Sequence, residues 1–353
     1  MEWLNHFFYP KSVAVIGASR SKKKIGRIIF DQLKASFPGK VFPVNKKAKR
    51  IGKDKCFPSV KEIPYQVDLA IIAIPPKFVK EVGEECVAKG VKAMVIITSG
   101  FGEVSKEGKK AEEELVEVCK GKARIIGPNV IGIYNSSNGL DALFLKRSRM
   151  ARPKKGVVSF ISQSGALGGA VLDWLAEMGI GIAKFASYGN AIDVNECDLL
   201  EYLGKDRETK VITAYLEGVR EGKRFLEVCR KVSKKKPLII LKGGKGKLGS
   251  KAVASHTGSM AGSYEIYRAA FKQAGIVEAF SIEELFDYAK VFASQPLPRN
   301  SDACIITNGG GFGVLASDEA EKQGIKLVPP VSYTHLRAHE TEADLVCRLL
   351  LEK

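Results

Sequence analysis

Long apolar stretches are missing from this chain of 353 residues. No run approaches the ~18 apolar residues that a membrane-spanning helix needs, and the N-terminus lacks the apolar core of a secretion signal. The seven cysteines form no CxxC pair and no regular framework, which argues against a disulfide scaffold and favours a reducing compartment. The sequence therefore predicts a cytoplasmic protein that does not enter a membrane.

Aromatic residues are also sparse, at 8% of the chain, and they do not alternate with basic residues as in a platform for stacking nucleic-acid bases. The 56 Lys and Arg outnumber the 39 Asp and Glu, so that the net charge is +17. Such an excess fits nucleic acid as a partner. The basic residues are spread along the whole chain, however, which favours solvated helix faces and a general attraction for anionic cofactors. A basic nucleic-acid-binding protein is kept as an alternative.

Glycine, by contrast, is abundant at 35 residues, and several glycines directly follow apolar runs, as in phosphate-binding turns. Apolar runs alternate with helix-length segments, which predicts an α/β fold with parallel sheets covered on both faces. In the first half the expected strands are 12–18, 41–45, 67–74, 93–99 and 124–126. In the second half they are 156–162, 180–186, 211–217 and 237–242.

The alternation divides the chain into successive units. We expect a first domain at 1–135, a polar linker at 136–155 and a second domain at 156–295. Residues 301–330 read as the truncated start of a third α/β domain, because one strand and one helix cannot bury a core. Residues 331–353 change in character and resemble vector read-through, so we expect this tail, with His335 and His339, to be foreign. Residues 243–262 are expected to form a long Gly- and Ser-rich loop, a length that usually marks a functional segment.

The turn after the first strand, with Gly17 and Ser19, aims backbone N–H groups and a helix N-terminus at an anion. A nicotinamide cofactor would require a carboxylate near the end of the next strand. Asn45 and Lys47 stand there instead, and a cation suits a phosphorylated ribose, as in CoA or NADP. The other interpretation is a solvated lysine loop.

A second anion site is predicted at Ser164, Gly165 and Ala166, where a strand again opens into a helix. Ser164 as the nucleophile of a hydrolase is disfavoured, because the G-x-S-x-G pattern is absent.

Outside the tail, the histidines are His6, which reads as a packing or surface residue, and His256. No Cys, Asp or second His stands near His256, so the sequence predicts no metal site there. A single histidine in a segment of small residues suits covalent carriage of a phosphoryl group, with a surface histidine as the alternative. A carrier histidine needs a partner that fixes its ring, and the candidate is Glu217, at the end of the strand 211–217. An exposed carboxylate at the strand end is its other interpretation.

These stretches together resemble the α subunit, or N-terminal half, of the ADP-forming acetyl-CoA synthetases, and more distantly the α subunit of succinyl-CoA synthetase. The most specific stretch of the resemblance is Lys242-Gly243-Gly244 through Ser255-His256-Thr257-Gly258-Ser259-Met260-Ala261-Gly262. The supporting stretches in order are Val13–Ser19, Pro43-Val44-Asn45, Ile74-Pro75-Pro76, Thr98-Ser99-Gly100-Phe101, Gly127-Pro128-Asn129 and Ser162–Ala166.

The resemblance implies a CoA-binding Rossmann domain followed by a flavodoxin-like domain and a ligase domain. It implies that His256 is phosphorylated, that Glu217 steadies it, and that Ser164, Gly165 and Ala166 hold the phosphate. The positions that would line CoA are Gly17, Ser19, Asn45, Lys47, Ile74, Pro75 and Ser99. The implied reaction converts acyl-CoA, ADP and phosphate into a carboxylic acid, ATP and CoA.

No ATP-grasp module is visible in the sequence. The resemblance therefore implies that ADP or ATP with Mg²⁺ binds to a partner β subunit or to a fused domain. Two alternatives stay open besides nucleic-acid binding: the acyl-CoA-sensing region of a protein acetyltransferase, and an NADP-dependent oxidoreductase. The acyl group and the choice between ADP and GDP are not encoded in any motif that we identify.

Overall fold

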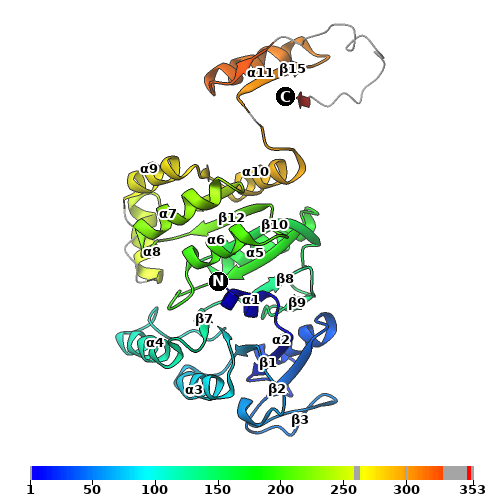
Figure 1. The fold of residues 1–353 in the computed structure, drawn as a ribbon, viewed down its shortest axis with the longest axis vertical. Helices are drawn as coiled ribbons and strands as arrows, with labels where there is room; N and C mark the ends of the chain where they lie inside the picture. Colours follow the sequence, from blue (N-terminus) through cyan, green and yellow to red (C-terminus); the bar gives the residue numbers. More distant parts are fainter. Residues whose placement is uncertain (1, 258–262, 299, 329–347, 351–353) are drawn as a thin grey trace. The chain divides into compact units, whose positions relative to one another are not determined.

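The structure is a computed structural model that describes residues 2–257, 263–298, 300–328 and 348–350. It divides into two compact units, Met1–Ser294 and Gln295–Lys353. The first unit contains two large sheets, one parallel and one mostly parallel, each flanked by helices (Figure 1). The expected α/β class is confirmed.

The first sheet has five parallel strands in the order β2-β1-β5-β6-β7. Their bounds are β1 Ser12–Ile16, β2 Lys40–Val44, β5 Leu69–Ile72, β6 Ala93–Ile96 and β7 Arg124–Ile126. Around them lie α1 (Glu2–Phe8), α2 (Ile25–Ser36), α3 (Val79–Lys89), α4 (Lys106–Cys119), the short 3₁₀ turns Val60–Glu62 and Pro76–Phe78, and the hairpin β3 (Arg50–Ile51) and β4 (Asp54–Lys55). The strand order reverses between β1 and β5, so a crevice for a ligand opens at their carboxyl ends.

The second sheet has seven strands in the order β14-β13-β12-β10-β11-β8-β9. Five are parallel: β10 Lys155–Ser162, β11 Ile182–Ser187, β12 Val211–Leu216, β13 Leu238–Lys242 and β14 Val277–Ala279. The helices are α5 (Gly165–Glu177), α6 (Glu196–Lys205), α7 (Gly222–Ser233), α8 (Lys247–Thr257), α9 (Tyr264–Ala274) and α10 (Ile282–Ser294). Here the order reverses around β10, which places a second crevice after Ser162.

The expectation that 136–155 is a linker is wrong in part, because this segment contributes to the second sheet. β8 (Ile133–Asn135) pairs antiparallel with β11, and β9 (Leu140–Asp141) pairs antiparallel with β8. The segment therefore forms one edge of the sheet rather than a free connection. Short antiparallel edge strands of two or three residues carry too little alternation to be recognised from sequence.

The expected loop at 243–262 is also corrected in part, because α8 covers Lys247–Thr257. Alanine, lysine and leucine favour a helix here more strongly than the single Gly249 opposes it. His256 therefore lies on the last turn of a helix, although its side chain lies outside what the structure describes. Residues 258–262 of the expected loop also lie outside the described residues.

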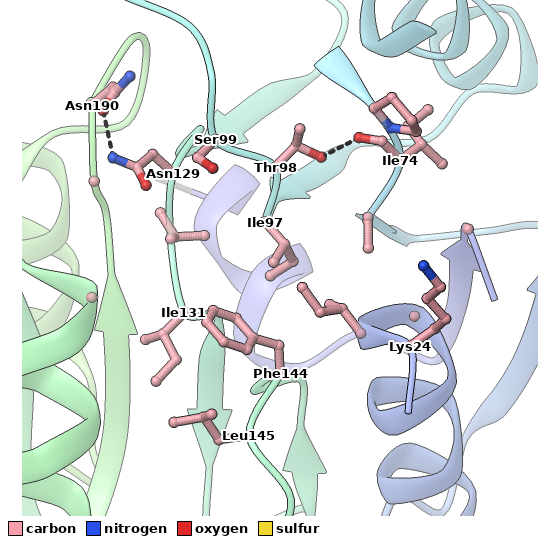
Figure 2. A pocket seen from close by; sticks show the side chains of 18 of the residues that line it. Lys24, Ile74, Ile97, Thr98, Ser99, Asn129, Ile131, Phe144, Leu145 and Asn190 are labelled. Atoms are coloured by element: carbon pink, nitrogen blue, oxygen red, sulfur yellow. Dashed lines mark hydrogen bonds between the residues drawn. The ribbon is translucent and has the colours of Figure 1, made fainter. Parts of the chain in front are cut away.

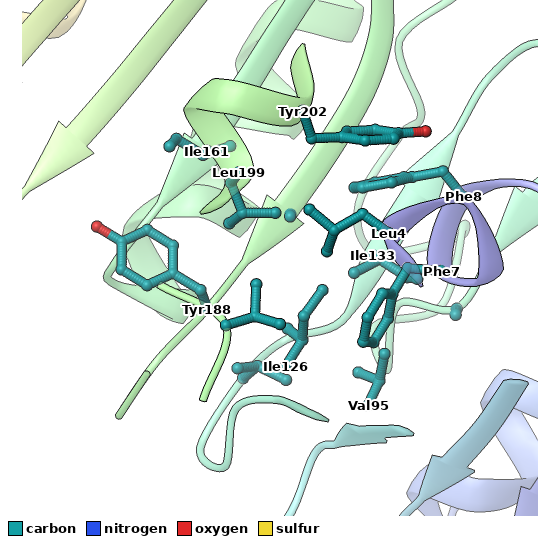
Figure 3. Close-up of a cluster of buried hydrophobic side chains, with 14 of the residues drawn as sticks. Leu4, Phe7, Phe8, Val95, Ile126, Ile133, Ile161, Tyr188, Leu199 and Tyr202 are labelled. Carbon is teal, nitrogen blue, oxygen red and sulfur yellow. The ribbon is translucent and has the colours of Figure 1, made fainter. Parts of the chain in front are cut away.

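One of the apolar clusters of the first unit joins its two sheets. Leu4, Phe7 and Phe8 of α1 are buried in one cluster together with strand residues of both sheets, among them Val95 and Ile161 (Figure 3). The ring of Phe8 stacks on that of Tyr202 in α6, with centroids 5.3 Å apart. Shared burial of this kind fixes the spacing of the two domains, and with it the geometry of any site between them.

Charged groups reinforce the same junction. Arg124 at the start of β7 donates from Nε to both carboxylate oxygens of Asp193, at 2.8 and 2.9 Å. Its Nη2 donates to Asp198 in α6 at 3.2 Å. Burial disfavours the charged guanidinium, but the bonds to Asp193 and Asp198 outweigh it and raise the pKa of Arg124. Arg124 therefore stays charged at any physiological pH.

The second unit contains β15 (Asp302–Ile306), α11 (Gly310–Lys322) and β16 (Lys326–Leu327), in agreement with the expected strand and helix. β15 pairs with β16 in parallel and with β17 (Arg348–Leu350) antiparallel. The other residues of the tail that we expect to be foreign lie outside the described residues. In the described part of the chain, no helix has the length and apolar character required to cross a bilayer.

Candidate functional site

A cavity of about 990 Å³ lies where the carboxyl ends of the two sheets meet. Most of the predicted site residues line it: Gly17, Ser19, Asn45, Ile74, Pro75, Ser99, Ser164, Gly165 and Ala166. The CoA-type turn and the second anion site, which the sequence treats as separate motifs, thus face one space. This volume is at the upper end of the ~300–1,000 Å³ found for small-molecule sites, which suits an elongated cofactor.

The first wall of the cavity is built around Gly17. Its φ of 95° lies in the left-handed region, and an added Cβ would come within 2.2 Å of the Ala73 carbonyl oxygen. Only glycine lets the turn after β1 approach β5 this closely. The Gly17 N–H donates to the carbonyl of Val44 at 3.0 Å, which ties the turn to β2 as well.

Asn45 holds the same wall from the end of β2. Its Nδ2 donates to the carbonyl of Ala18 at 2.7 Å, and its Oδ1 accepts from the Lys47 N–H at 2.8 Å. Lys47 is not among the residues that line the cavity, so the structure brings together all predicted CoA positions except this one. The cation that does line it is Lys24, directly before α2 (Figure 2).

The opposite wall is the N-terminus of α5. Ser164 is the N-cap, and its Oγ accepts from the Leu167 N–H at 3.4 Å. The first N–H groups of a helix have no partner within the helix, and the helix dipole adds a partial positive charge. The turn at Gly165 and Ala166 therefore offers an anion site that opens into the cavity.

Glu217 lies behind this wall, at the end of β12, and is buried. Its N–H and that of Gly218 both donate to Oε1 of Gln163, at 2.7 and 3.1 Å. Gln163 itself lines the cavity and so connects Glu217 to the turn that holds Ser164. The Tyr215 hydroxyl donates to Glu217 Oε1 at 3.4 Å, and burial together with this carboxylate raises the pKa of Tyr215 to about 12.

Lys242 at the end of β13 completes the surroundings of Glu217. Its Nζ donates to the Glu217 backbone carbonyl at 2.8 Å and lies 4.6 Å from the ring centroid of Tyr267. Burial lowers its pKa to about 8. The position of the His256 side chain relative to Glu217 lies outside what the structure describes, so their pairing stays a prediction.

Lys24, Phe144, Gln163 and Asn190 are among the lining residues that sequence reasoning did not assign to the site. Lys24 belongs to a run of three lysines that reads as solvated, and Phe144 lies in the segment expected as a linker. Gln163 and Asn190 each follow a strand. This places them near the end of a sheet but does not indicate that they bind a ligand. Among the described residues, no group of three His, Cys, Asp or Glu is placed to hold a metal ion.

Comparison with known proteins agrees with this architecture. Residues 11–136 match the family described as CoA binding domain, and residues 155–292 match the succinyl-CoA ligase like flavodoxin domain. A solved structure of dinucleotide forming acetyl-coenzyme A synthetase 1 from Ca. Korarchaeum cryptofilum, in complex with phosphate and ADP, is similar with a TM-score of 0.86 and 41% identity. The match covers 94% of this chain and 71% of that one.

Two curated relatives show how much of such an enzyme the chain represents. It is 51% identical to the α subunit of acetate–CoA ligase (ADP-forming) II of Pyrococcus furiosus, over 92% of this chain and 70% of that subunit. It is 46% identical to acetate–CoA ligase (ADP-forming) I of Archaeoglobus fulgidus, over 92% of this chain but only 46% of that protein. Because the identity is high and the match spans both domains, the chain belongs to the α-subunit family of the ADP-forming acyl-CoA ligases.

Proposed function

We propose that this chain binds CoA and carries phosphate in the reaction that converts acyl-CoA, ADP and phosphate into a carboxylic acid, ATP and CoA. The observation that carries the proposal is the cavity in which a turn suited to CoA and a helix N-terminus suited to phosphate face each other. Proximity of the thioester and the phosphate is what the first chemical step requires.

In that step an oxygen of phosphate attacks the thioester carbonyl, the C–S bond breaks, and CoA leaves as the thiolate. The product is an acyl phosphate held at the N-terminus of α5. A ring nitrogen of His256 then attacks phosphorus, the bond to the acyl oxygen breaks, and the carboxylate leaves. Finally ADP attacks the phosphohistidine, which forms ATP and returns the imidazole.

Different residues of the chain would bind CoA, bind the phosphate and orient His256. The turn at Gly17, with Asn45 and Lys24, would hold the anionic parts of CoA. Ser164 and the N–H groups of Gly165 and Ala166 would hold the phosphate and stabilise negative charge as it develops. Ser19, Lys47, Ile74, Pro75 and Ser99 complete the proposed CoA contacts. Glu217 would orient the ring of His256 by accepting from its second nitrogen.

The nucleotide belongs to another part of the assembly in this proposal. We place ADP or ATP with Mg²⁺ on an ATP-grasp β subunit or fused domain. The relatives are consistent with such an arrangement, since the chain covers 70% of an α subunit in one and 46% of a longer protein in the other. Six cysteines of the described chain are free and buried, which fits the reducing cytosol in which we expect the protein.

Neither the sensor of a protein acetyltransferase nor an NADP-dependent oxidoreductase gains support from the comparisons. The test is reconstitution of the chain with an ATP-grasp β subunit, followed by measurement of ATP from acetyl-CoA, ADP and phosphate. We expect ATP only when both proteins are present. CoA binding without ATP formation in the reconstituted complex would favour the sensor, and absence of CoA binding would contradict the proposal.

A further inference from the structure

Asn190 occupies the junction where the second domain contacts both the first domain and the cavity. It follows β11, and its backbone N–H donates to the carbonyl of Pro128 in the first domain at 3.1 Å. Arg220 holds the same loop, because its Nη2 donates to the Asn190 carbonyl at 2.8 Å. The side chain of Asn190 lines the cavity.

Two carboxylates of the first domain bracket the amide of Asn190. Its Nδ2 donates to Oε2 of Glu103 at 2.6 Å and to Oε1 of Glu112 at 2.7 Å. Further donors hold both acceptors: the Gly100 N–H bonds Glu103 at 2.6 Å, and Lys109 bonds Glu112 at 3.1 Å. Glu112 is almost fully buried, with 3% of its side chain exposed.

This arrangement determines which way the Asn190 amide faces. Burial raises the pKa of Glu103, but hydrogen bonds outweigh burial, among them those from the backbone N–H groups of Gly100 and Phe101, so the net pKa is lowered and the carboxylate is ionised at neutral pH. An ionised carboxylate only accepts hydrogen bonds, so the group between the two must be the NH₂ of Asn190. Oδ1 of Asn190 then points to the other side.

On that other side stands Asn129, from the loop after β7. Its Nδ2 donates to Oδ1 of Asn190 at 3.4 Å (Figure 2). Since Asn190 presents an acceptor, Asn129 must present its NH₂ to Asn190, which leaves its own Oδ1 as an acceptor on the far side of the amide. Asn129 also lines the cavity. The orientation of one cavity-lining carbonyl is thus set by carboxylates that do not line it.

We propose that Asn190 is a positioning residue. It transmits the orientation set by Glu103 and Glu112 to Asn129, which presents a fixed hydrogen-bond acceptor to a donor group of CoA. The relay also ties the two domains at the spacing that the cavity requires. This inference rests on the proposed function, because it takes CoA as the occupant of the cavity.

The test is CoA affinity of the full chain, measured by isothermal titration calorimetry. Asn190→Asp keeps the shape but places a third carboxylate between Glu103 and Glu112 and removes the donor. We expect about 10- to 100-fold weaker CoA binding. Adding Glu103→Gln to this variant returns an NH₂ donor to the pair with its direction reversed, and we expect it to recover at least about fivefold of the loss.

The matched control is Asn195→Asp, five residues further along. Asn195 also donates its Nδ2 to a carboxylate, Glu221, at 3.1 Å, but it does not line the cavity. As the N-cap of α6 it can be replaced by aspartate without loss of the cap. We expect its CoA affinity to stay within about twofold of the wild type.

A double-mutant cycle tests the relay without an added charge, should Asn190→Asp fail to fold. If Asn190 acts through Asn129, the variant carrying both Asn190→Ala and Asn129→Ala loses no more affinity than the worse single variant. Losses that simply add would overturn the proposal, as would unchanged binding by Asn190→Asp or no recovery with Glu103→Gln. A wild-type chain that binds no CoA would instead overturn the proposed function.

Discussion

Replacing Gly17 by alanine tests whether the turn after β1 builds the cavity. The added Cβ would lie 2.2 Å from the Ala73 carbonyl oxygen and 2.9 Å from Cγ2 of Ile74. An ordinary C···O contact is about 3.3 Å, so the turn and the end of β5 must separate by roughly 1 Å. The turn and the end of β5 both carry residues that line the cavity, so the substitution should distort the ligand site as well as the fold.

The expected loss of stability has two parts. Alanine in the left-handed region costs about 1–2 kcal/mol, and the forced shift of packed backbone adds about 1–3 kcal/mol. Gly90 provides a control, because its φ of 84° is similar but nothing lies within 4 Å of an added Cβ. Gly90→Ala should therefore cost only the first part, about 1–2 kcal/mol.

Urea unfolding gives the stabilities of the two variants, and calorimetric titration gives their CoA affinities. We expect Gly17→Ala to lose clearly more stability than Gly90→Ala and more than about tenfold in CoA affinity, with normal affinity in Gly90→Ala. Equal stability losses in the two variants, or normal CoA binding by Gly17→Ala, would refute the assignment of this turn to the ligand site.

Two further perturbations test the junction and the buried carboxyl of α6. Phe8→Ala should destabilise both domains of the first unit together, by about 3–5 kcal/mol, because Phe8 lies in the core that they share. Urea transitions followed by the fluorescence of Trp3 and of Trp174, each in a variant lacking the other, should coincide; separate transitions would refute a common core. Burial raises the pKa of Glu196 to about 7, so wild-type stability should fall as pH rises from about 4.5 through 7. Glu196→Gln should remove this dependence and be more stable than wild type by about 3 kcal/mol at pH 8 but not at pH 4; an unchanged pH profile would contradict the buried, protonated state.

Most of the parallel strands could be predicted from sequence because burial on both faces makes them continuous apolar runs. β1, for example, covers Ser12–Ile16 within the expected 12–18. The short parallel strand β14 (Val277–Ala279) was not expected. β8 and β9 could not be predicted, because they are short, and β8 is held by pairing with β11, far along the chain, while β9 pairs only with β8 among the described strands. α8 was missed because glycine and serine around it suggested a loop, whereas its interior is rich in helix formers.

The residues of the cavity likewise divide into those that the sequence could predict and those that it could not. Turns directly after strands, at Gly17 and Ser164, carry a local signal, because a strand that opens into a helix is visible in the sequence. The two carboxylates that bond Asn190 have no such local signal. Glu103 and Glu112 are 87 and 78 residues away in sequence and meet Asn190 only because the two domains pack together. Phe144 was missed for the same reason, because its segment becomes part of the wall only when β9 joins β8.

Phosphorylation of His256 is the most direct test of the account. The chain is incubated with an ATP-grasp β subunit, acetyl-CoA and ³²P-labelled phosphate, in parallel with His256→Ala and with the control His6→Ala. We expect an acid-labile, base-stable label on the wild type and on His6→Ala, and none on His256→Ala. A label that persists in His256→Ala, or a wild type that binds CoA and forms ATP once ADP is added although no histidine was labelled before, would contradict the role of His256 as the phosphoryl carrier.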